Sequence, residues 1–566
     1  MAANNRCDVR CVDSDQTIDI AFTYSFDTSF KRNFHFKRDK NETLKQTFQR
    51  ISLNVIKCMK NGNKKQKQTT RDKTETNDLT IELIADDITV SNDSFNRDVW
   101  KSGDILKVGD NIFDVYLNAP SVKSIRLAKV IMSSFKVYPI VSLEFCTLSD
   151  CKFEWLRQLT KKSENVTKKS CEEWETVGEE GFCYTVRSDD IGYKLKVVCS
   201  PTSGRQYEAI SENTIDANPG LCPFQERHVF CQTDVSYNCF RILSYNILAD
   251  IYADSDYSRT VLYPYCPPYA LAIDYRKQLL LNEIIGYNAD ICCLQEVDKY
   301  VFNNDLKPIL SSLKDKKFRS FFSEKGNTGE GLATFVNENR FEVINTEKVN
   351  ISNELKTNPI FDNLLHNISA NEKLFDRLMA RKSIIQVILV RDLQVNDKTL
   401  LIGNTHLYFH PDSDHIRLIQ SYIYVKYIEN LIKVLSEKRP ELNVSPILCG
   451  DYNSCPEFGV FQLMTNGFVG KDSQDFRSNS DETIDGLDLS HSLSFGSACD
   501  EPIYTNYTPF FSGCLDYIFY DKNNLMVSEI IPLPDHQQVS ANTALPSIVF
   551  PSDHLAIICV LQWKPS

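Results

Sequence analysis

The chain has 566 residues, of which 42% are hydrophobic and 24% are charged, and its formal net charge at pH 7 is −12. This is the composition of an ordinary globular protein, long enough for about two to four domains. The negative charge argues against a protein that coats duplex nucleic acid, since such proteins are usually basic. No stretch approaches the roughly 20 apolar residues of a membrane span. The longest apolar stretch, residues 383–390, predicts a core strand.

The cysteines and the N-terminus predict a reducing, intracellular environment. The nineteen cysteines are spread along the chain, several of them inside apolar stretches, and no CxxC pair of the zinc-binding kind occurs. Buried, reduced thiols are therefore predicted. The N-terminus contains Arg6 and Arg10, but it also contains three aspartates and no hydrophobic secretory stretch. It predicts neither a transit peptide nor a signal peptide.

Residues 1–127 predict a small α+β module. Alternating residues indicate strands at 18–26 and 33–37, and residues 42–59 carry apolar side chains at helical spacing. Further strands are predicted at 79–85 and at 105–117, where a turn at Gly109 interrupts the second stretch. The polar, lysine-rich residues 60–78 predict a disordered loop. A basic RNA contact is the weaker alternative for this loop.

Residues 128–220 predict an immunoglobulin-like β-sandwich. Trp155 and Trp174 are expected to fill the space between its sheets, and Cys146 and Cys199 are expected to remain free thiols. No catalytic constellation occurs in the first 220 residues, so we expect these residues to serve binding, positioning or stability. Residues 217–234, which include a Pro-Gly pair, predict a linker. The predicted strands are at 141–146, 153–157, 174–177 and 193–199.

From residue 236 onward, polar side chains repeatedly adjoin apolar, strand-like stretches. Residues 291–294 predict a strand buried on both faces, followed directly by Gln295 and Glu296. An isolated carboxylate there is costly unless a positive charge meets it, and we therefore predict that Glu296 is a metal ligand. The other polar groups of this kind are Asn246, His406, Asp451 with Asn453, Asp516, and Asp553 with His554.

Each of these groups taken alone has a simple structural explanation. Asp451 and Asn453 suit a turn beside Gly450, and His406 suits a hydrogen-bonded core position. The whole set, each member next to an apolar strand, instead favours metal-assisted phosphodiester hydrolysis. The hard oxygen ligands Glu296, Asp451 and Asn453 suit Mg²⁺, with Mn²⁺ as an alternative, rather than zinc.

The histidines and the remaining amide suit the phosphate itself. His554 paired with a carboxylate can orient water or hold a phosphate. His406 and Asn246 can donate hydrogen bonds to phosphoryl oxygens, where negative charge grows in the transition state.

These motifs resemble the exonuclease–endonuclease–phosphatase superfamily. The resemblance implies an α/β fold, in which a two-sheet α/β sandwich forms the catalytic domain over residues 236–566 and β-rich modules precede it. Residues 244–250, 262–268, 274–276 and 404–411 further resemble the poly(A)-deadenylase branch. The motifs that carry the resemblance are Tyr245-Asn246, Leu294-Gln295-Glu296, Asn404-Thr405-His406, Gly450-Asp451-Tyr452-Asn453-Ser454, Leu515-Asp516-Tyr517 and Ser552-Asp553-His554.

The resemblance implies a role for each of these residues. Glu296 matches the principal Mg²⁺ ligand, and Asp451 matches the acid/base residue or second ligand, with Asn453 beside it. Asp553 matches a ligand or water-orienting residue. His554 matches a histidine that contacts the phosphate, and Asp516 supports it. Asn246 and His406 match two further phosphate-contacting residues.

The resemblance also implies a substrate. Asn506 and Phe511 match positions that hold the adenine base, where aromatic stacking contributes roughly 1–3 kcal/mol per base. The implied reaction is hydrolysis of 2′,5′-oligoadenylates and removal of 3′,5′-linked poly(A) tails, with release of AMP. RNA or oligoadenylate is the expected partner, and no membrane or stable protein partner is expected.

The sequence leaves two localisations and two alternative functions open. Relatives in the branch imply the mitochondrial matrix through a presequence that this N-terminus lacks, and the cytoplasm is the alternative. A phosphoinositide or lipid phosphatase on the same fold is disfavoured by the stretch Tyr263-Pro264-Tyr265-Cys266-Pro267-Pro268. A catalytically inactive interaction protein is disfavoured because Glu296, Asp451 and His554 are all present.

Overall fold

The structure, a computed structural model, describes residues 5–26, 31–62, 79–159, 173–202, 205–485 and 487–565. The predicted loop at 60–78 lies outside the described residues from residue 63 onward. Two compact units are present: Met1–Ile125 with Val141–Glu154 and Val197–Ala209, and Arg126–Ile140 with Trp155–Lys196 and Ile210–Ser566. The boundaries predicted from the sequence, 1–127, 128–220 and 236–566, stay predictions. No helix in the described ranges is long and apolar enough to cross a membrane.

The N-terminal region is a seven-stranded sheet packed against one helix. The helix α1 (Leu44–Gly62) confirms the helical prediction, and its buried residues Leu44, Phe48, Ile51 and Val55 belong to one apolar core with the sheet. The sheet order is β3-β2-β1-β7-β6-β4-β5. Its strands are β1 (Asn5–Arg10), β2 (Thr17–Ser25), β3 (Lys31–Asp39), β4 (Ile81–Ala85), β5 (Ile88–Thr89), β6 (Ile105–Val108) and β7 (Asn111–Leu117).

The middle region consists of small sheets. One has four strands in the order β12-β11-β14-β15, and two pairs, β10-β8 and β13-β9, accompany it. Trp155 is fully buried as predicted, but Trp174 is only partly buried, with the Lys196 ammonium 4.7 Å from its ring centroid. Cys146 and Cys199 are free thiols. The strands are β8 (Ser121–Arg126), β9 (Lys136–Val137), β10 (Ile140–Glu144), β11 (Cys151–Gln158), β12 (Trp174–Glu180), β13 (Tyr184–Thr185), β14 (Leu195–Pro201) and β15 (Tyr207–Ile210).

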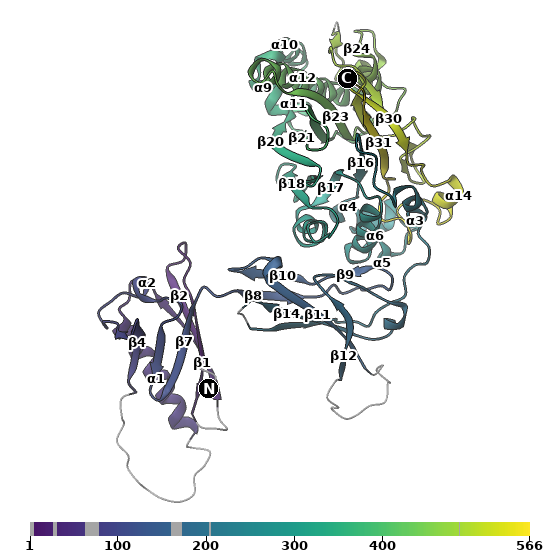
Figure 1. The fold of residues 1–566 in the computed structure, drawn as a ribbon. Coiled ribbons are helices and arrows are strands. Elements are labelled where there is room, and N and C mark those ends of the chain that lie inside the picture. Colours follow the sequence, from purple (N-terminus) through teal and green to yellow (C-terminus); the bar gives the residue numbers. More distant parts are fainter. Residues whose placement is uncertain are drawn as a thin grey trace, which may run out of the picture. The chain divides into compact units, whose positions relative to one another are not determined.

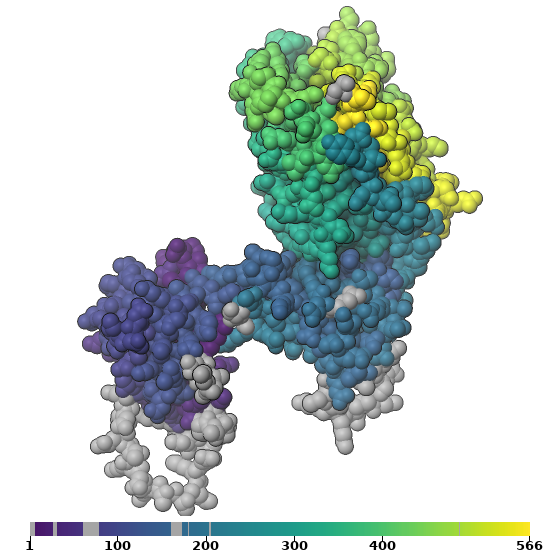
Figure 2. Space-filling model, in the orientation of Figure 1, coloured from purple at the N-terminus to yellow at the C-terminus, as the bar shows by residue number. Residues whose placement is uncertain are grey.

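The linker predicted at 217–234 is wrong as a description of the structure, because this segment is folded and packed. It contains α3 (Pro223–Arg227) and η4 (His228–Cys231), in which Phe224, Arg227 and Cys231 are buried. The Arg227 guanidinium donates to the Pro532 and Ala556 carbonyls, at 2.9 and 2.8 Å. Figure 2 shows the blue-green surface of this part of the chain against the yellow surface of the C-terminal residues.

Residues 239–563 form two packed six-stranded sheets, as predicted, with helices on their outer faces (Figure 1). One sheet has the order β18-β19-β17-β16-β31-β30, with β18 (Phe318–Glu324), β19 (Glu330–Asn337), β17 (Ile291–Asp298), β16 (Cys239–Asn246), β31 (Ile557–Trp563) and β30 (Leu525–Ile530). The other has the order β20-β21-β22-β23-β29-β26, with β20 (Phe341–Asn350), β21 (Ile384–Asp392), β22 (Lys398–His406), β23 (Asn443–Asp451), β29 (Asp516–Asp521) and β26 (Phe495–Ser497).

The apolar residues of the inner strands fill the space between the sheets. Ile242, Ile291, Ile402, Ile447 and Ile518 belong to this central core. Outside the sheets, α6 (Ile273–Gly286) packs on the first sheet and α12 (Asp414–Lys438) on the second. Continuous apolar sequence in the inner strands is the consequence of burial on both faces.

Candidate active site

The ends of four inner strands meet at one edge of the sandwich. β16 pairs with β17 in parallel, and β22 pairs with β23 in parallel. Asn246 is the last residue of β16, His406 the last of β22 and Asp451 the last of β23. Carboxyl ends of parallel strands lie at the same edge of a sheet, so residues distant in sequence converge there.

A β-bulge presents Glu296 at this edge. The pairing of β17 with β19 is interrupted between Leu294 and Val297, and Glu296 has a φ of +52°. A positive φ is uncommon for glutamate and persists only where neighbouring contacts enforce it. The Glu296 carboxylate accepts hydrogen bonds from Asn246 Nδ2 at 3.1 Å and from the Ala249 main chain at 3.2 Å. The bulge therefore directs this carboxylate toward the site.

Asn246 connects the two sheets. Its Nδ2 also donates to Asp451 Oδ2 at 3.0 Å, so one amide contacts the carboxylates of Glu296 and Asp451. Gln295 and Asn404 form a second connection between the sheets, with 2.9 Å between Gln295 Nε2 and Asn404 Oδ1. These buried amides fix the relative position of the strands that carry the acids.

His554 is held between two carboxylates. Its Nδ1 lies 2.8 Å from Asp516 Oδ2, and its Nε2 lies 3.6 Å from Asp451 Oδ2. Asp516 Oδ2 also accepts a hydrogen bond from the Thr505 hydroxyl at 2.5 Å. His406 Nε2 lies 3.5 Å from Asp451 Oδ2 and 3.9 Å from Glu296 Oε1. The structure thus brings Asn246, Glu296, His406, Asp451, Asp516 and His554 together.

Burial and neighbouring charges shift the pKa values of the two acids and the two histidines of the site in different directions. Burial, together with the charge of Asp553, raises the pKa of Glu296 to about 7, and burial together with Asp516 raises the pKa of Asp451 to about 6. Burial also lowers the pKa of His406 well below its usual value, which keeps this imidazole neutral. Burial opposes the charge of His554, but Asp516 and Asp451 outweigh it and raise the pKa of His554 well above its usual value.

The carboxylates of the site fit a divalent cation, whereas His554, held between two of them, suits a phosphate. In the described part of the chain, one group of three ligand-bearing side chains, Asp451, Asp516 and His554, has its ligand atoms within 4.8 Å of one another. Asp516 Oδ1 is buried without a hydrogen-bond partner. Glu296 shares the Asn246 amide with Asp451, so a third carboxylate adjoins this group. Crowded carboxylates whose charge is disfavoured by burial are stabilised when a cation binds.

The remaining predicted residues lie around this centre. Asn453, with a φ of +51°, donates its Nδ2 to the Leu407 carbonyl at 3.1 Å, which leaves its amide oxygen available. Asp553 accepts a hydrogen bond from the Tyr263 hydroxyl at 3.0 Å. Asn506 pairs with His554 through an isolated β-bridge, whereas Phe511 is 44% exposed. Their catalytic and substrate-binding roles stay predictions.

Several supporting residues were not predicted. Thr505 holds Asp516, Ser552 donates to the Asn246 carbonyl at 2.7 Å, and Lys325 contributes to the low pKa of His406. Thr505 and Ser552 immediately precede Asn506 and Asp553 in the sequence, which is the one signal that singles them out. Lys325 lies in the turn between β18 and β19 and has no distinguishing motif.

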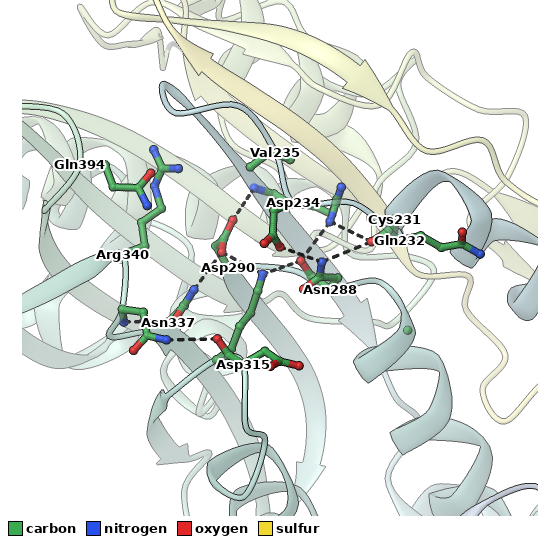
Figure 3. A pocket seen from close by; sticks show the side chains of 14 residues that line it. Cys231, Gln232, Asp234, Val235, Asn288, Asp290, Asp315, Asn337, Arg340 and Gln394 are labelled. Atoms are coloured by element: carbon green, nitrogen blue, oxygen red, sulfur yellow. Dashed lines mark hydrogen bonds and ion pairs between the residues drawn. The ribbon is translucent and has the colours of Figure 1, made fainter.

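A separate polar pocket of about 560 Å³ lies at the beginning of β17 rather than at its end (Figure 3). Asp290 occupies its centre and accepts hydrogen bonds from Asn337 Nδ2 at 3.0 Å and Lys316 Nζ at 2.9 Å. Arg340 pairs with Asp392 at 3.0 Å, and Arg241 donates to main-chain carbonyls. Because Asp290 and Arg340 are paired with opposite charges and Arg241 is bonded to carbonyls, we assign this pocket a structural role and place the chemistry at Glu296.

Comparison with known proteins identifies the family of the chain. A sequence profile of the endonuclease/exonuclease/phosphatase family matches residues 236–554. The chain belongs to this family. A profile of the 2′,5′-phosphodiesterase 12-like N-terminal domain matches residues 119–218. The resemblance predicted from the motifs is therefore confirmed, and the chain is an enzyme of the phosphodiesterase and nuclease type.

Relatives that match almost the whole of this chain are named 2′,5′-phosphodiesterase 12. The chain is 35% identical over 593 residues to 2′,5′-phosphodiesterase 12 of Rattus norvegicus, covering 99% of this chain and 95% of the relative. The identity to the human protein of that name is 35% over 590 residues, with the same coverage. The Ccr4 3′-5′-exoribonuclease subunit of the CCR4-Not complex of Mycosarcoma maydis is 29% identical over 359 residues, covering 59% of this chain and 52% of that relative.

Solved structures are similar to part of this chain at lower levels of sequence identity. The 2′,3′-cyclic phosphatase ANGEL2 with adenosine-2′,3′-vanadate is 20% identical, with a TM-score of 0.47, covering 58% of this chain and 96% of that chain. The human Nocturnin catalytic domain is 21% identical, with a TM-score of 0.37, covering 59% of this chain and 96% of that chain.

Proposed function

We propose that this chain hydrolyses phosphodiester bonds between adenylates in the presence of Mg²⁺. The substrates are 2′,5′-oligoadenylates and the 3′,5′-linked poly(A) tails of RNA, and the product is AMP. The observation that carries this proposal is the convergence of Glu296, Asp451 and His554 on one site. Support for the adenylate substrate comes from the similarity, over 99% of this chain, to proteins named 2′,5′-phosphodiesterase 12.

Glu296 and Asp451, with the amide oxygen of Asn453, would hold the cation. A divalent ion bound there supplies charge neutralisation at nonbridging phosphate oxygens and lowers the pKa of a coordinated water. We propose that Asp451 Oδ2 accepts the proton of the attacking water, because this carboxylate oxygen lies at the centre of the site, 3.5 Å from His406 Nε2 and 3.6 Å from His554 Nε2.

The two histidines have different tasks because their charges differ. His554, protonated and held at Nδ1 by Asp516, is oriented to donate through Nε2 to a phosphoryl oxygen. His406 is neutral, so it serves as a hydrogen-bonding group rather than as a charge. Asn246 Nδ2 donates to the carboxylates of Glu296 and Asp451 and so orients them, in place of the predicted hydrogen bond to a phosphoryl oxygen.

The hairpin β27–β28 (Asn506–Tyr507 and Ser512–Gly513) is the proposed adenine subsite. Its residue Asn506 adjoins His554 through the β-bridge, and the Phe511 ring, in the turn between the two strands, offers an exposed face. Aromatic stacking on a base needs such a face, and an amide supplies hydrogen bonds to the base edge.

The test is an incubation of the purified protein with 2′,5′-triadenylate, oligo(A) and oligo(U), each with Mg²⁺ and with EDTA. The proposal expects AMP from the first two substrates, loss of AMP release in EDTA, and recovery when Mg²⁺ is restored in excess. Turnover that survives EDTA, or release from oligo(U) as fast as from oligo(A), would contradict it.

A further inference from the structure

Two motifs of the sequence, residues 262–268 and 274–276, have no role in the chemistry described so far. Both contribute to one continuous segment, residues 263–276, which includes α5 (Pro268–Leu271) and the first residues of α6. This segment contacts residues 545–553, which directly precede His554, through four side chains. The donors are Tyr263, Tyr265, Tyr275 and Arg276.

Each donor has a different acceptor along the later segment. The Tyr265 hydroxyl donates to the Leu545 carbonyl, and the Tyr275 hydroxyl donates to the Ile548 carbonyl at 2.7 Å. Arg276 Nη1 donates to the Pro551 carbonyl at 3.1 Å. The contacts therefore advance along residues 545–553 and reach a catalytic side chain only at the last of them, Asp553.

Arg276 joins this segment to the loop that follows Asn246. Its side chain is fully buried, and the same Nη1 donates to the Ile247 and Leu248 carbonyls at 3.3 and 2.8 Å. The loop so held includes Ala249, whose main-chain amide donates to Glu296. A buried guanidinium is costly unless its donors are used. Here Nη1 holds together the loops on both sides of the site, whereas Nη2 has no hydrogen-bond partner and lies 3.7 Å from Asp250 Oδ1.

Tyr263 acts on the Asp553 side chain directly. The tyrosine is 5% exposed, and its hydroxyl donates to Asp553 Oδ2 at 3.0 Å. Burial and the charge of Asp553 raise the pKa of Tyr263 well above its usual value, so the hydroxyl remains a donor. Within the described residues, no other donor forms a hydrogen bond with the Asp553 carboxylate. One hydroxyl thus sets the orientation of this carboxylate.

We propose that Tyr263 and Arg276 are positioning residues of the phosphodiesterase reaction. Tyr263 fixes the Asp553 carboxylate, and Arg276 fixes the two loops that carry Asn246 on one side and Asp553 and His554 on the other. Neither residue touches the reacting atoms. This inference rests on the proposed function. It assigns a role to residues 262–268 and 274–276, which take no direct part in the chemistry.

The decisive comparison is Tyr263→Phe against Tyr275→Phe, since each removes one hydroxyl bonded to residues 545–553 and keeps the ring. Deleting a hydrogen bond to a charged partner lowers kcat for 2′,5′-triadenylate by about 10- to 100-fold in Tyr263→Phe. KM is expected to change less than about twofold. In Tyr275→Phe we expect kcat to stay within about twofold of the parent. The fall in Tm is expected to be similar in the two variants. Equal kcat in the two variants would overturn the inference.

Amide hydrogen exchange separates failure of this inference from failure of the proposed function. Faster exchange at residues 552–554 in Tyr263→Phe, but not in Tyr275→Phe, supports the positioning of Asp553 even if the parent released no AMP. Unchanged exchange at those residues in Tyr263→Phe would overturn it. For Arg276, the lysine variant keeps a cationic donor, so Arg276→Lys is expected to retain more kcat than Arg276→Met. Equal kcat in the two Arg276 variants would overturn its role. If Arg276→Met does not fold, parental amide exchange at residues 247–249 and 552–554 in Arg276→Lys, together with the kcat of the parent, would overturn it.

Discussion

Asp516 offers the sharpest single-residue prediction of the catalytic account. It holds His554 Nδ1 at 2.8 Å and receives the Thr505 hydroxyl at 2.5 Å, and its charge raises the pKa of His554. Asp516→Asn keeps the size of the side chain but removes this charge. A hydrogen bond to a charged group is worth about 1.5–3 kcal/mol, so we expect kcat to fall about 10- to 150-fold.

The assay is the rate of AMP release from 2′,5′-triadenylate at saturating Mg²⁺, measured across pH. With Asp516 present, His554 stays protonated into the alkaline range, and activity that needs this proton is lost only as the pH rises through the raised pKa. In Asp516→Asn the alkaline loss is expected at lower pH. Asp521→Asn, in the same strand β29 and also buried, is the matched control and should keep kcat within about twofold. Asp516→Asn with parental kcat and an unchanged pH profile would refute the reasoning.

Three further predictions concern stability, base binding and the cation. Burial raises the pKa of Glu283 from 4.5 to about 7. The folded protein therefore keeps this proton between those pH values while the unfolded chain loses it. Stability from this group is full below pH 4.5 and falls by about 3 kcal/mol as the pH rises through 7; urea unfolding of Glu283→Gln should lack this fall. Phe511→Ala should raise KM for oligo(A) about 5- to 150-fold, and Phe510→Ala much less, in steady-state assays. Mg²⁺ should raise the Tm of the parent in calorimetry, but not that of Asp451→Asn.

The pattern of apolar strands with polar residues at their ends identified the candidate catalytic residues, and the family resemblance of these motifs implied the two-sheet α/β fold that the structure has. Strands such as β17 and β23 are buried on both faces, so their sequences are continuously apolar and the acids that follow them stand out. The same contrast identified Asn246 and His406 at the ends of β16 and β22.

What the sequence did not predict depends on contacts between residues far apart in the chain. The bulge at Glu296 follows from the pairing of β17 with β19, and the contact of Tyr263 with Asp553 joins residues 290 positions apart. The segment 217–234 was predicted as a linker from its Pro-Gly pair, although its apolar Phe224 and Cys231 indicate packing. Trp174 was predicted to fill the space between the sheets, but it is only partly buried, and the Lys196 ammonium lies 4.7 Å from its ring centroid.

The central claim is that side chains from four strand ends surround one divalent cation that serves phosphodiester cleavage. Its most direct test is Mg²⁺ binding by titration calorimetry together with AMP release, for the parent and for Glu296→Ala. The account predicts that the variant keeps its circular dichroism spectrum, binds Mg²⁺ far more weakly and loses turnover about 1,000-fold or more. A folded Glu296→Ala protein that binds Mg²⁺ and releases AMP at the parental rate would contradict it.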